Sequence, residues 1–345
     1  MTSPAVRRDS RPPRSWADFA LARGGFYHDP RWLEALAGCF TLRACCLTAG
    51  EDGAVQGTLA LLEVPALLGP RRLVSLPFSY AAGPLATSPA VAALLAREAV
   101  AAARARHITR VEIKRLGAGE PPPEGFERVL HYSTYRLPTE GDVWSRLDKS
   151  STQRGIRKAE KSGVEVARGA SEEDWARMAG LEDRSARGHG VPAPPAAFFT
   201  RTCRQLQTAG LADLLLARLA DGRLAAGLVL WKGAREWIYA FGASDPATLE
   251  FRPNHGLLWT AVQEAARAGV VFDLGRAAPE QAGLVEFKRR WGGQPVPLAY
   301  DYWPRARGLN AAARDRGGLA VAARLWSHLP VPVTRLGSAL YRYLG

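Results

Sequence analysis

The feature that most constrains the fold is an order of elements that occurs twice along the 345-residue chain. In each half, apolar runs separated by glycine-containing turns predict an antiparallel meander, which a helix, a strand and a final strand follow. The second copy begins roughly 160 residues after the first, which is the length of a domain rather than of a solenoid repeat. We therefore expect an α+β chain of two similar units with mixed antiparallel and parallel sheets flanked by helices.

The elements of the two copies can be placed by their periodicity. In the first copy, strands are expected at 41–48, 55–64, 73–80, 108–114 and 128–137, with an alanine-rich helix at 88–106. In the second copy, helices are expected at 171–187, 195–209, 253–268 and 279–290, and strands at 211–219, 224–232, 236–243, 270–274 and 297–302.

Four segments follow from this arrangement. Residues 1–15 carry four arginines and several prolines and are expected to be disordered. Residues 16–145 and 146–304 are the expected domains. Residues 305–345 hold seven arginines and one acid, and apolar residues at helical spacing predict a basic amphipathic helical tail. Such a tail either lies on an anionic membrane surface or packs back on the body of the protein.

The charge balance favours an anionic partner. The chain has 46 Lys and Arg against 33 Asp and Glu, a formal net charge of +13. This predicts a phosphate-bearing substrate, RNA or an anionic membrane surface nearby. A hydrophobic fraction of 47% excludes a disordered chain. No run approaches the roughly 18 apolar residues that a membrane span needs.

The four cysteines show neither CxxC spacing nor a Cys/His pattern for zinc. They predict reduced thiols in a cytoplasmic protein without a metal site. We also expect no tightly bound cofactor, and the basic tail suits peripheral association with the inner membrane face.

A basic stripe is expected just before the second copy. Ser150 and Gln153 fit a capping box, so a helix is expected to begin there. Four bases then fall at helical spacing on one face: Arg154, Arg157, Lys158 and Lys161. Such a stripe suits phosphate binding, and the alternative is a solvated basic face beside a linker.

Two further patterns place chemistry-bearing residues in the second copy. Asp273 and Arg276 follow an apolar strand, a common position for active-site groups, although a structural ion pair fits as well. Lys288 shares a helical face with Phe287 and Trp291. A lysine on an apolar stripe is paired, used in chemistry, or extended to the surface.

Signatures of other enzyme classes are missing from the sequence. There is no GxSxG elbow, no P-loop and no HExxH. The segment 207–212 matches the acetyl-CoA loop of simple N-acetyltransferases, Gln/Arg-x-x-Gly-x-Gly/Ala, but it ends a helix and enters a strand. Gly210 is therefore expected to terminate a helix.

Six segments between 145 and 303 together resemble the Fem family of peptidyltransferases (FemAB type) within the GNAT superfamily. These are Arg154-x-Ile-Arg-Lys-Ala-Glu-Lys-x-Gly-Val, Tyr239-x-Phe-Gly-Ala-Ser, Pro253-Asn-x-x-Leu-Leu-Trp, Phe272-Asp-Leu-Gly-Arg, Gly283-Leu-x-x-Phe-Lys-x-x-Trp-Gly and Pro297-Leu-x-Tyr-x-Tyr. Tyr27-His28-x-Pro-x-Trp is a weaker match in the first half, and the tail is similar to that of exosortase-associated members.

The resemblance implies two tandem GNAT-like domains and transfer of an acyl or aminoacyl group to an amine on a peptidoglycan or exopolysaccharide precursor. It implies a catalytic Phe287–Lys288 pair, with Asp273 and Arg276 beside it. Arg154 and Arg157 loosely match the family's phosphate-binding bases. With Lys158 of the same basic stripe, and Tyr239 and Asn254 of the matching motifs, they make up the expected substrate-binding group. The acyl donor, aminoacyl-tRNA or acyl-CoA, would be a co-substrate, and the acceptor would be phosphate-bearing or lipid-linked.

Three alternatives stay open at this point. No insertion is long enough for the helical arm that some peptidyltransferases use for tRNA, which leaves an acyl-CoA-dependent N-acetyltransferase. The basic tail also fits a non-catalytic membrane-associated envelope-assembly factor with a GNAT-like body. RNA binding rests on charge alone.

Overall fold

A computed structural model describes residues 4–51, 53–66, 70–305 and 337–343, and they fall into two compact units. Unit 1 comprises the described residues up to 132 together with 297–305 and 340–343, and unit 2 comprises 133–296 and 337–339. Apart from 305 and 337–343, the expected tail lies outside the described residues. The expected domain limits at 145 and 304 stay a prediction.

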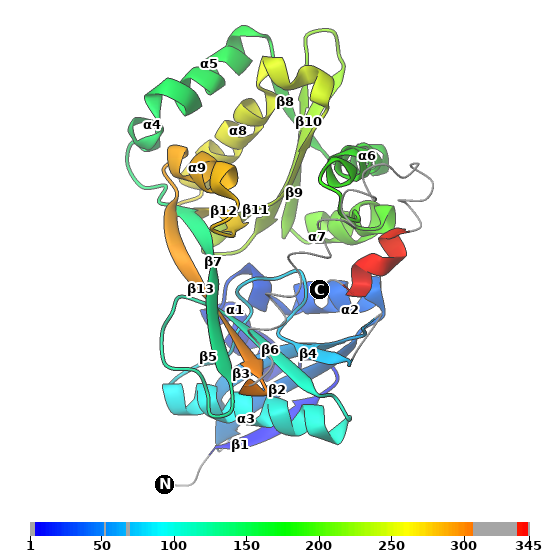
Figure 1. Ribbon diagram of the computed structural model, residues 1–345, viewed down its shortest axis with the longest axis vertical. Coiled ribbons are helices and arrows are strands. Elements are labelled where there is room, and N and C mark those ends of the chain that lie inside the picture. Colours follow the sequence, from blue (N-terminus) through cyan, green and yellow to red (C-terminus); the bar gives the residue numbers. More distant parts are fainter. Residues whose placement is uncertain (1–3, 52, 67–69, 306–336, 344–345) are drawn as a thin grey trace. The chain divides into compact units, whose positions relative to one another are not determined.

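Unit 1 is a sheet with helices packed against it (Figure 1). Its strands follow the order β1 (Ala5–Asp9), β2 (Arg43–Glu51), β3 (Ala54–Val64), β4 (Arg72–Val74), β6 (Arg110–Leu116) and β13 (Gln294–Trp303), with β5 (Leu85–Ala86) paired to β3. Its helices are α1 (Arg14–Arg23), the turn η1 (Phe26–His28), α2 (Pro30–Phe40) and α3 (Pro89–Ala105). The buried core joins α3 to strands β2, β3 and β6.

The expectation of disorder over residues 1–15 is wrong for the first strand. Residues 5–9 form β1, which pairs antiparallel with β2 from Ala5↔Gly50 to Asp9↔Cys46. Arg8 forms an ion pair of 2.7 Å with Glu98 of α3. The arginines of this segment suit an edge strand, because the outward side chains of such a strand remain in water.

The strands of unit 2 follow the order β7 (Glu127–Leu137, of which residues 133–137 belong to this unit), β12 (Val271–Ala277), β11 (Glu236–Ser244), β10 (Leu224–Lys232), β9 (Ala212–Arg218) and β8 (Glu165–Gly169). Its helices are α4 (Val143–Arg146), α5 (Arg154–Lys161), α6 (Glu172–Gly188), α7 (Arg204–Thr208), α8 (Pro253–Arg267) and α9 (Ala282–Arg290). Shorter turns are η2 (Lys149–Gln153), η3 (Phe198–Cys203), η4 (Pro246–Phe251) and η6 (Gly337–Tyr343). The predicted α+β class is confirmed, and β9, β10 and β11 form the expected antiparallel meander.

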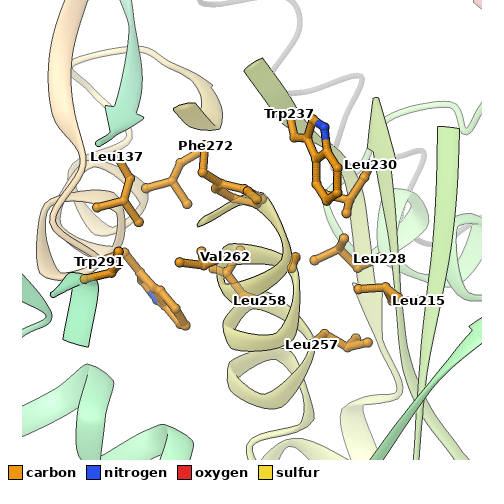
Figure 2. Packing of buried hydrophobic residues seen from close by; sticks show 14 of the residues in the cluster. Leu137, Leu215, Leu228, Leu230, Trp237, Leu257, Leu258, Val262, Phe272 and Trp291 are labelled. Atoms are coloured by element: carbon orange, nitrogen blue, oxygen red, sulfur yellow. The ribbon is translucent and has the colours of Figure 1, made fainter. Parts of the chain in front are cut away.

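Helix α8 organises the core of unit 2, as Figure 2 shows. It begins with a proline in its first turn and ends at Arg267, and Gly269 just beyond it has a φ of +65°, a backbone conformation that is common after the end of a helix. Leu258 and Val262 lie on its buried face, with Trp291 and Phe272 on one side and Leu228 on the other. The core thereby holds α9 and β12, the elements with the predicted catalytic residues, against one helix.

Two local predictions differ from the structure. The strand expected at 73–80 ends at Val74, because Leu76 and Phe78 adopt left-handed backbone angles that leave a sheet. The expected capping box at Ser150 and Gln153 is also wrong. Asp148 caps this segment instead, since its Oδ1 accepts hydrogen bonds from the Ser151 amide and the Ser150 hydroxyl.

Among the described residues, no helix has both the length and the apolar character that crossing a membrane requires.

Candidate active site

The two parallel strands in the middle of unit 2, β11 and β12, pair over only part of their length. β11 and β12 pair only from Glu236↔Val271 to Ile238↔Asp273, although β11 runs on to Ser244 and β12 to Ala277. The register also shifts on both outer sides, between Val229 and Leu230 of β10 and between Asp273 and Arg276 of β12. Irregularities of this kind free backbone groups from the ladder, and they gather here beside Tyr239 and Gly275.

Lys288 reaches this irregular backbone from α9. Its side chain is buried, with 4% of the residue exposed, and its ammonium donates to the carbonyl oxygens of Gly275 at 2.6 Å and Arg276 at 2.8 Å. The Nζ atom lies 5.7 Å from the centroid of the Tyr135 ring. Of the alternatives for a lysine on an apolar stripe, extension to the surface is thus wrong. An ammonium has three donors, and these two bonds leave one for another group.

The surroundings of Lys288 tune its charge. Burial lowers the pKa of Lys288 to about 8, and the cation of Arg276 adds to this lowering while Asp273 opposes it. At neutral pH the side chain is therefore mostly an ammonium, but one that loses its proton far more readily than a surface lysine.

Asp273 acts through the backbone that receives Lys288. It is 3% exposed, and its Oδ1 accepts hydrogen bonds from the Thr134 hydroxyl and, at 2.8 Å, from the Gly275 amide. Gly275 has a φ of +80°, and a Cβ atom there would lie 3.2 Å from the Tyr239 carbonyl oxygen. The sequence Asp-Leu-Gly thus forms a tight turn that directs two carbonyls at the lysine.

Arg276 and Phe287 are placed differently from the expected catalytic group. The Arg276 residue is exposed, and its carbonyl rather than its guanidinium binds Lys288. The half-buried Phe287 ring lies 6.3 Å from His255 and 6.1 Å from Trp291, measured between ring centroids. Phe287 therefore packs towards α8, and its expected catalytic role stays a prediction.

The basic stripe is exposed on α5. Gly155, Ile156 and Ala159 form the buried face, and the four bases lie in solvent. Arg157 lies 5.4 Å from the Trp144 ring, and the close approach of His255 leaves no room for a side chain at Gly155. The Thr152 hydroxyl donates to the Arg290 carbonyl at 3.0 Å, so the turn before α5 is bonded to the end of α9.

Tyr239 and Asn254 also lie in unit 2. Asn254 is half-buried in the first turn of α8. Tyr239 is half-buried on β11, and its hydroxyl lies against Gly242, where any side chain would collide with it. Burial raises the pKa of the Tyr239 phenol, and the nearby Glu182 raises it further, so this hydroxyl stays protonated.

Glu182 is a candidate site residue that the sequence motifs do not indicate. It lies on α6, which packs on β11, and burial raises the pKa of its carboxyl group to about 7. Its signal was present in the sequence, because Glu182 follows the buried residues Met178 and Ala179 at helical spacing. A carboxyl that titrates near neutral pH can exchange a proton under physiological conditions.

The structure therefore brings together Lys288, Asp273 and the backbone of 275–276. The turn before α5 is bonded to the end of α9 through the Arg290 carbonyl, whereas Asn254 stays a sequence-based candidate.

Comparison with known proteins gives one family match. Residues 148–289 match the family described as "Acetyltransferase (GNAT) domain". Among curated protein sequences, none matches the chain.

Several solved structures share the fold over nearly their whole length. The crystal structure of FemX has a TM-score of 0.67 and 17% identity, covering 86% of this chain and 96% of FemX. L-PGS from Bacillus licheniformis has a TM-score of 0.58 and 13% identity, with 93% and 99% covered. A tandem GNAT protein from the clavulanic acid biosynthesis pathway has a TM-score of 0.52 and 13% identity, with 86% and 98% covered. The predicted tandem GNAT-like fold is thereby confirmed.

Proposed function

Since residues 148–289 belong to the GNAT acyltransferases and the fold is that of FemX, we propose that this enzyme transfers an acyl or aminoacyl group to an amine on a cell-envelope precursor. The observation that carries the proposal is the buried ammonium of Lys288, held by the carbonyls of Gly275 and Arg276 where the parallel strands separate. A desolvated cation with a free donor suits stabilisation of developing negative charge.

The chemistry needs no covalent enzyme intermediate. The acceptor amine attacks the carbonyl carbon of an ester or thioester, a C–N bond forms, and the C–O or C–S bond of the donor breaks. The proton of the amine leaves with the departing alcohol or thiol. Lys288 would stabilise the oxyanion formed during attack, and Asp273 would hold the turn that positions Lys288.

The donor and acceptor are proposed by class. The exposed bases of α5 suit a phosphate-bearing molecule such as aminoacyl-tRNA or acyl-CoA. One structural neighbour with a TM-score of 0.55 is the C-terminal domain of a putative lysylphosphatidylglycerol synthetase from Agrobacterium fabrum, and its name supports an aminoacylated envelope lipid as one product class. Peripheral association with the inner membrane face through 305–345 is part of the same proposal.

A transfer assay tests the proposal. The protein is incubated with a pool of charged tRNA or with acetyl-CoA, and with a UDP-linked muropeptide or an amine-bearing polysaccharide as acceptor. Lys288→Ala should lower kcat by roughly 10²- to 10³-fold. Arg289→Ala, an exposed neighbour on the same helix, is the matched control and should retain activity.

The outcomes separate the alternatives. Transfer from acetyl-CoA alone would favour an acyl-CoA-dependent N-acetyltransferase, which the name of the matched family supports. Full activity of Lys288→Ala would contradict the site. Absence of transfer from every donor, in a folded protein, would favour the non-catalytic envelope-assembly factor.

A further inference from the structure

Unit 1 holds a cavity of about 940 Å³ that the proposed transfer does not use. It is lined by residues that belong to or adjoin several elements of this unit: β1, α2, β2, β3, β4 and α3. One wall is apolar and includes Leu33 and Ala37 of α2 and Leu42 beside β2. Its volume falls within the range of small-molecule sites, which is roughly 300–1,000 Å³.

Four arginines converge on this cavity from separate parts of the chain. Arg11 follows β1, Arg43 begins β2, Arg71 precedes β4, and Arg106 follows α3. Two carboxylates, of Glu34 and Glu63, line the same space, so the charged lining is four cations against two anions. The arrangement is a product of the fold, because no two of these arginines are neighbours in the sequence.

Glu63 forms ion pairs with two of these arginines, Arg71 and Arg106. Its residue is 8% exposed, and its carboxylate lies 2.5 Å from Arg71 and 3.9 Å from Arg106. Arg71 also donates to the Arg106 carbonyl at 3.0 Å, which satisfies a backbone group at the end of α3. These contacts fix Arg71 in the wall, and the Nη1 atom of Arg106 is left without a hydrogen bond.

Arg11 and Arg43 differ from Arg71 and Arg106 in their contacts. Both are exposed at the cavity, and neither makes a hydrogen bond or an ion pair with any residue that the structure describes. Since neither guanidinium group has an ion-pair partner among the described residues, an anion bound in the cavity would be attracted by both. Guanidinium groups match the oxygens of phosphate in pairs of parallel hydrogen bonds.

We propose that this cavity of unit 1 binds a small phosphate-bearing molecule, with its phosphate group against Arg11 and Arg43 and its less polar part along Leu33, Ala37 and Leu42. A dianionic phosphomonoester or diphosphate matches the excess of two positive charges in the lining. The inference does not rest on the acyl-transfer proposal, because it uses no residue of the Lys288 site.

Binding is measured by isothermal titration calorimetry on the full chain at low and moderate salt. The probes are inorganic pyrophosphate, UDP and a short-chain phosphatidylglycerol, which separate a free diphosphate, a nucleotide and a lipid headgroup as the source of the phosphate. Arg11→Ala and Arg43→Ala should each raise Kd at least tenfold. Arg97→Ala is the matched control and should leave Kd unchanged. Arg97 is exposed in the middle of α3 and forms no ion pair with a described residue.

A variant of opposite sign makes the test sharper. Glu34 lines the cavity and makes no ion pair with a described residue, so Glu34→Gln removes repulsion and should lower Kd. Unchanged affinity in Arg11→Ala and Arg43→Ala, with thermal unfolding showing that both are folded, would overturn the proposal. So would an equal loss in Arg97→Ala, because the binding would then reflect net charge alone.

Discussion

Lys288 is a residue whose surroundings decide its charge state. Its ammonium is bound by two peptide carbonyls inside unit 2, and its pKa is lowered to about 8 by burial. The sequence predicted an unusual lysine from its apolar spacing, but it did not predict these acceptors. The carbonyls of residues 275 and 276 are available because the pairing register of β12 with β7 shifts there. The side-chain pattern of the sequence does not reveal such a shift.

The pH dependence of transfer follows from this pKa. If the cation is the working form, kcat is constant below pH 7 and falls as the pH rises through 8, since the lysine loses its proton there. Lys288→Arg keeps its charge at higher pH, so the variant should be slower but should lose this decline. Rates are measured from pH 6 to 9.5. A wild-type rate that rises through pH 8 would show that the free amine is the working form.

The same shift has a consequence for stability with a defined sign. The folded protein binds the Lys288 proton less tightly than the unfolded chain, so burial of this group opposes folding below pH 8. Its contribution to the free energy of unfolding therefore improves between pH 8 and the ordinary lysine pKa near 10.5.

The sequence predicted helices and strands better than the turns and register shifts between them. Period and turn residues located α8 and the meander β9–β10–β11, because a buried helix face and alternating strands leave direct patterns. Strand β8 was missed, since Glu165–Gly169 has only five residues and mostly exposed side chains, so it leaves no alternating apolar pattern. The left-handed turn at Leu76 and Phe78 was missed as well, because neither residue type favours that conformation. Among the site residues, Lys288 and Asp273 were indicated by their positions on an apolar helix face and at the end of an apolar strand, and the family resemblance added a catalytic role for Lys288. Glu182 is indicated only by its burial.

The turn at the end of β12 gives a prediction about one glycine. Gly275→Ala imposes a left-handed backbone angle on alanine and also brings a Cβ atom to 3.2 Å from the Tyr239 carbonyl oxygen. Gly222→Ala is the matched control, because its φ of +83° costs the same backbone strain of about 1–2 kcal/mol but its Cβ atom meets open space.

Urea unfolding and the transfer assay together check this comparison. Both variants should lose stability, with the larger loss in Gly275→Ala. Only Gly275→Ala should also lose activity, since it displaces the carbonyl that holds Lys288. Equal activity in the two variants would show that the placement of this carbonyl is unimportant.

At the scale of the whole molecule, a net charge of +13 is compatible with an anionic surface as well as with a small anionic ligand. The last described segment adds a constraint, because Tyr341 stacks on Phe78 with ring centroids 4.6 Å apart and Arg72 donates to the Tyr343 carbonyl at 3.1 Å. Residues 341–343 therefore pack on unit 1. The seven arginines from 305 to 345 remain the candidates for contact with lipid headgroups.

Vesicle sedimentation distinguishes these roles. Replacing Arg314, Arg316 and Arg324 by Gln should weaken binding to vesicles that contain phosphatidylglycerol, and salt should weaken wild-type binding in the same way. Tyr341→Ala should instead lower the thermal unfolding temperature and leave vesicle binding unchanged. If the triple variant binds vesicles as the wild type does, the predicted membrane role of the tail is wrong.

The use of main-chain carbonyls to hold Lys288 has an evolutionary consequence. Every amino acid supplies such a carbonyl, so position 276 can drift without moving the ammonium, whereas position 275 admits little besides glycine. In distant relatives we expect the glycine and the lysine to persist together while the side chain at 276 varies. A paired Gly and Lys, separated by the short connection into the late helix, would then be a better guide to ancestry than any acidic residue.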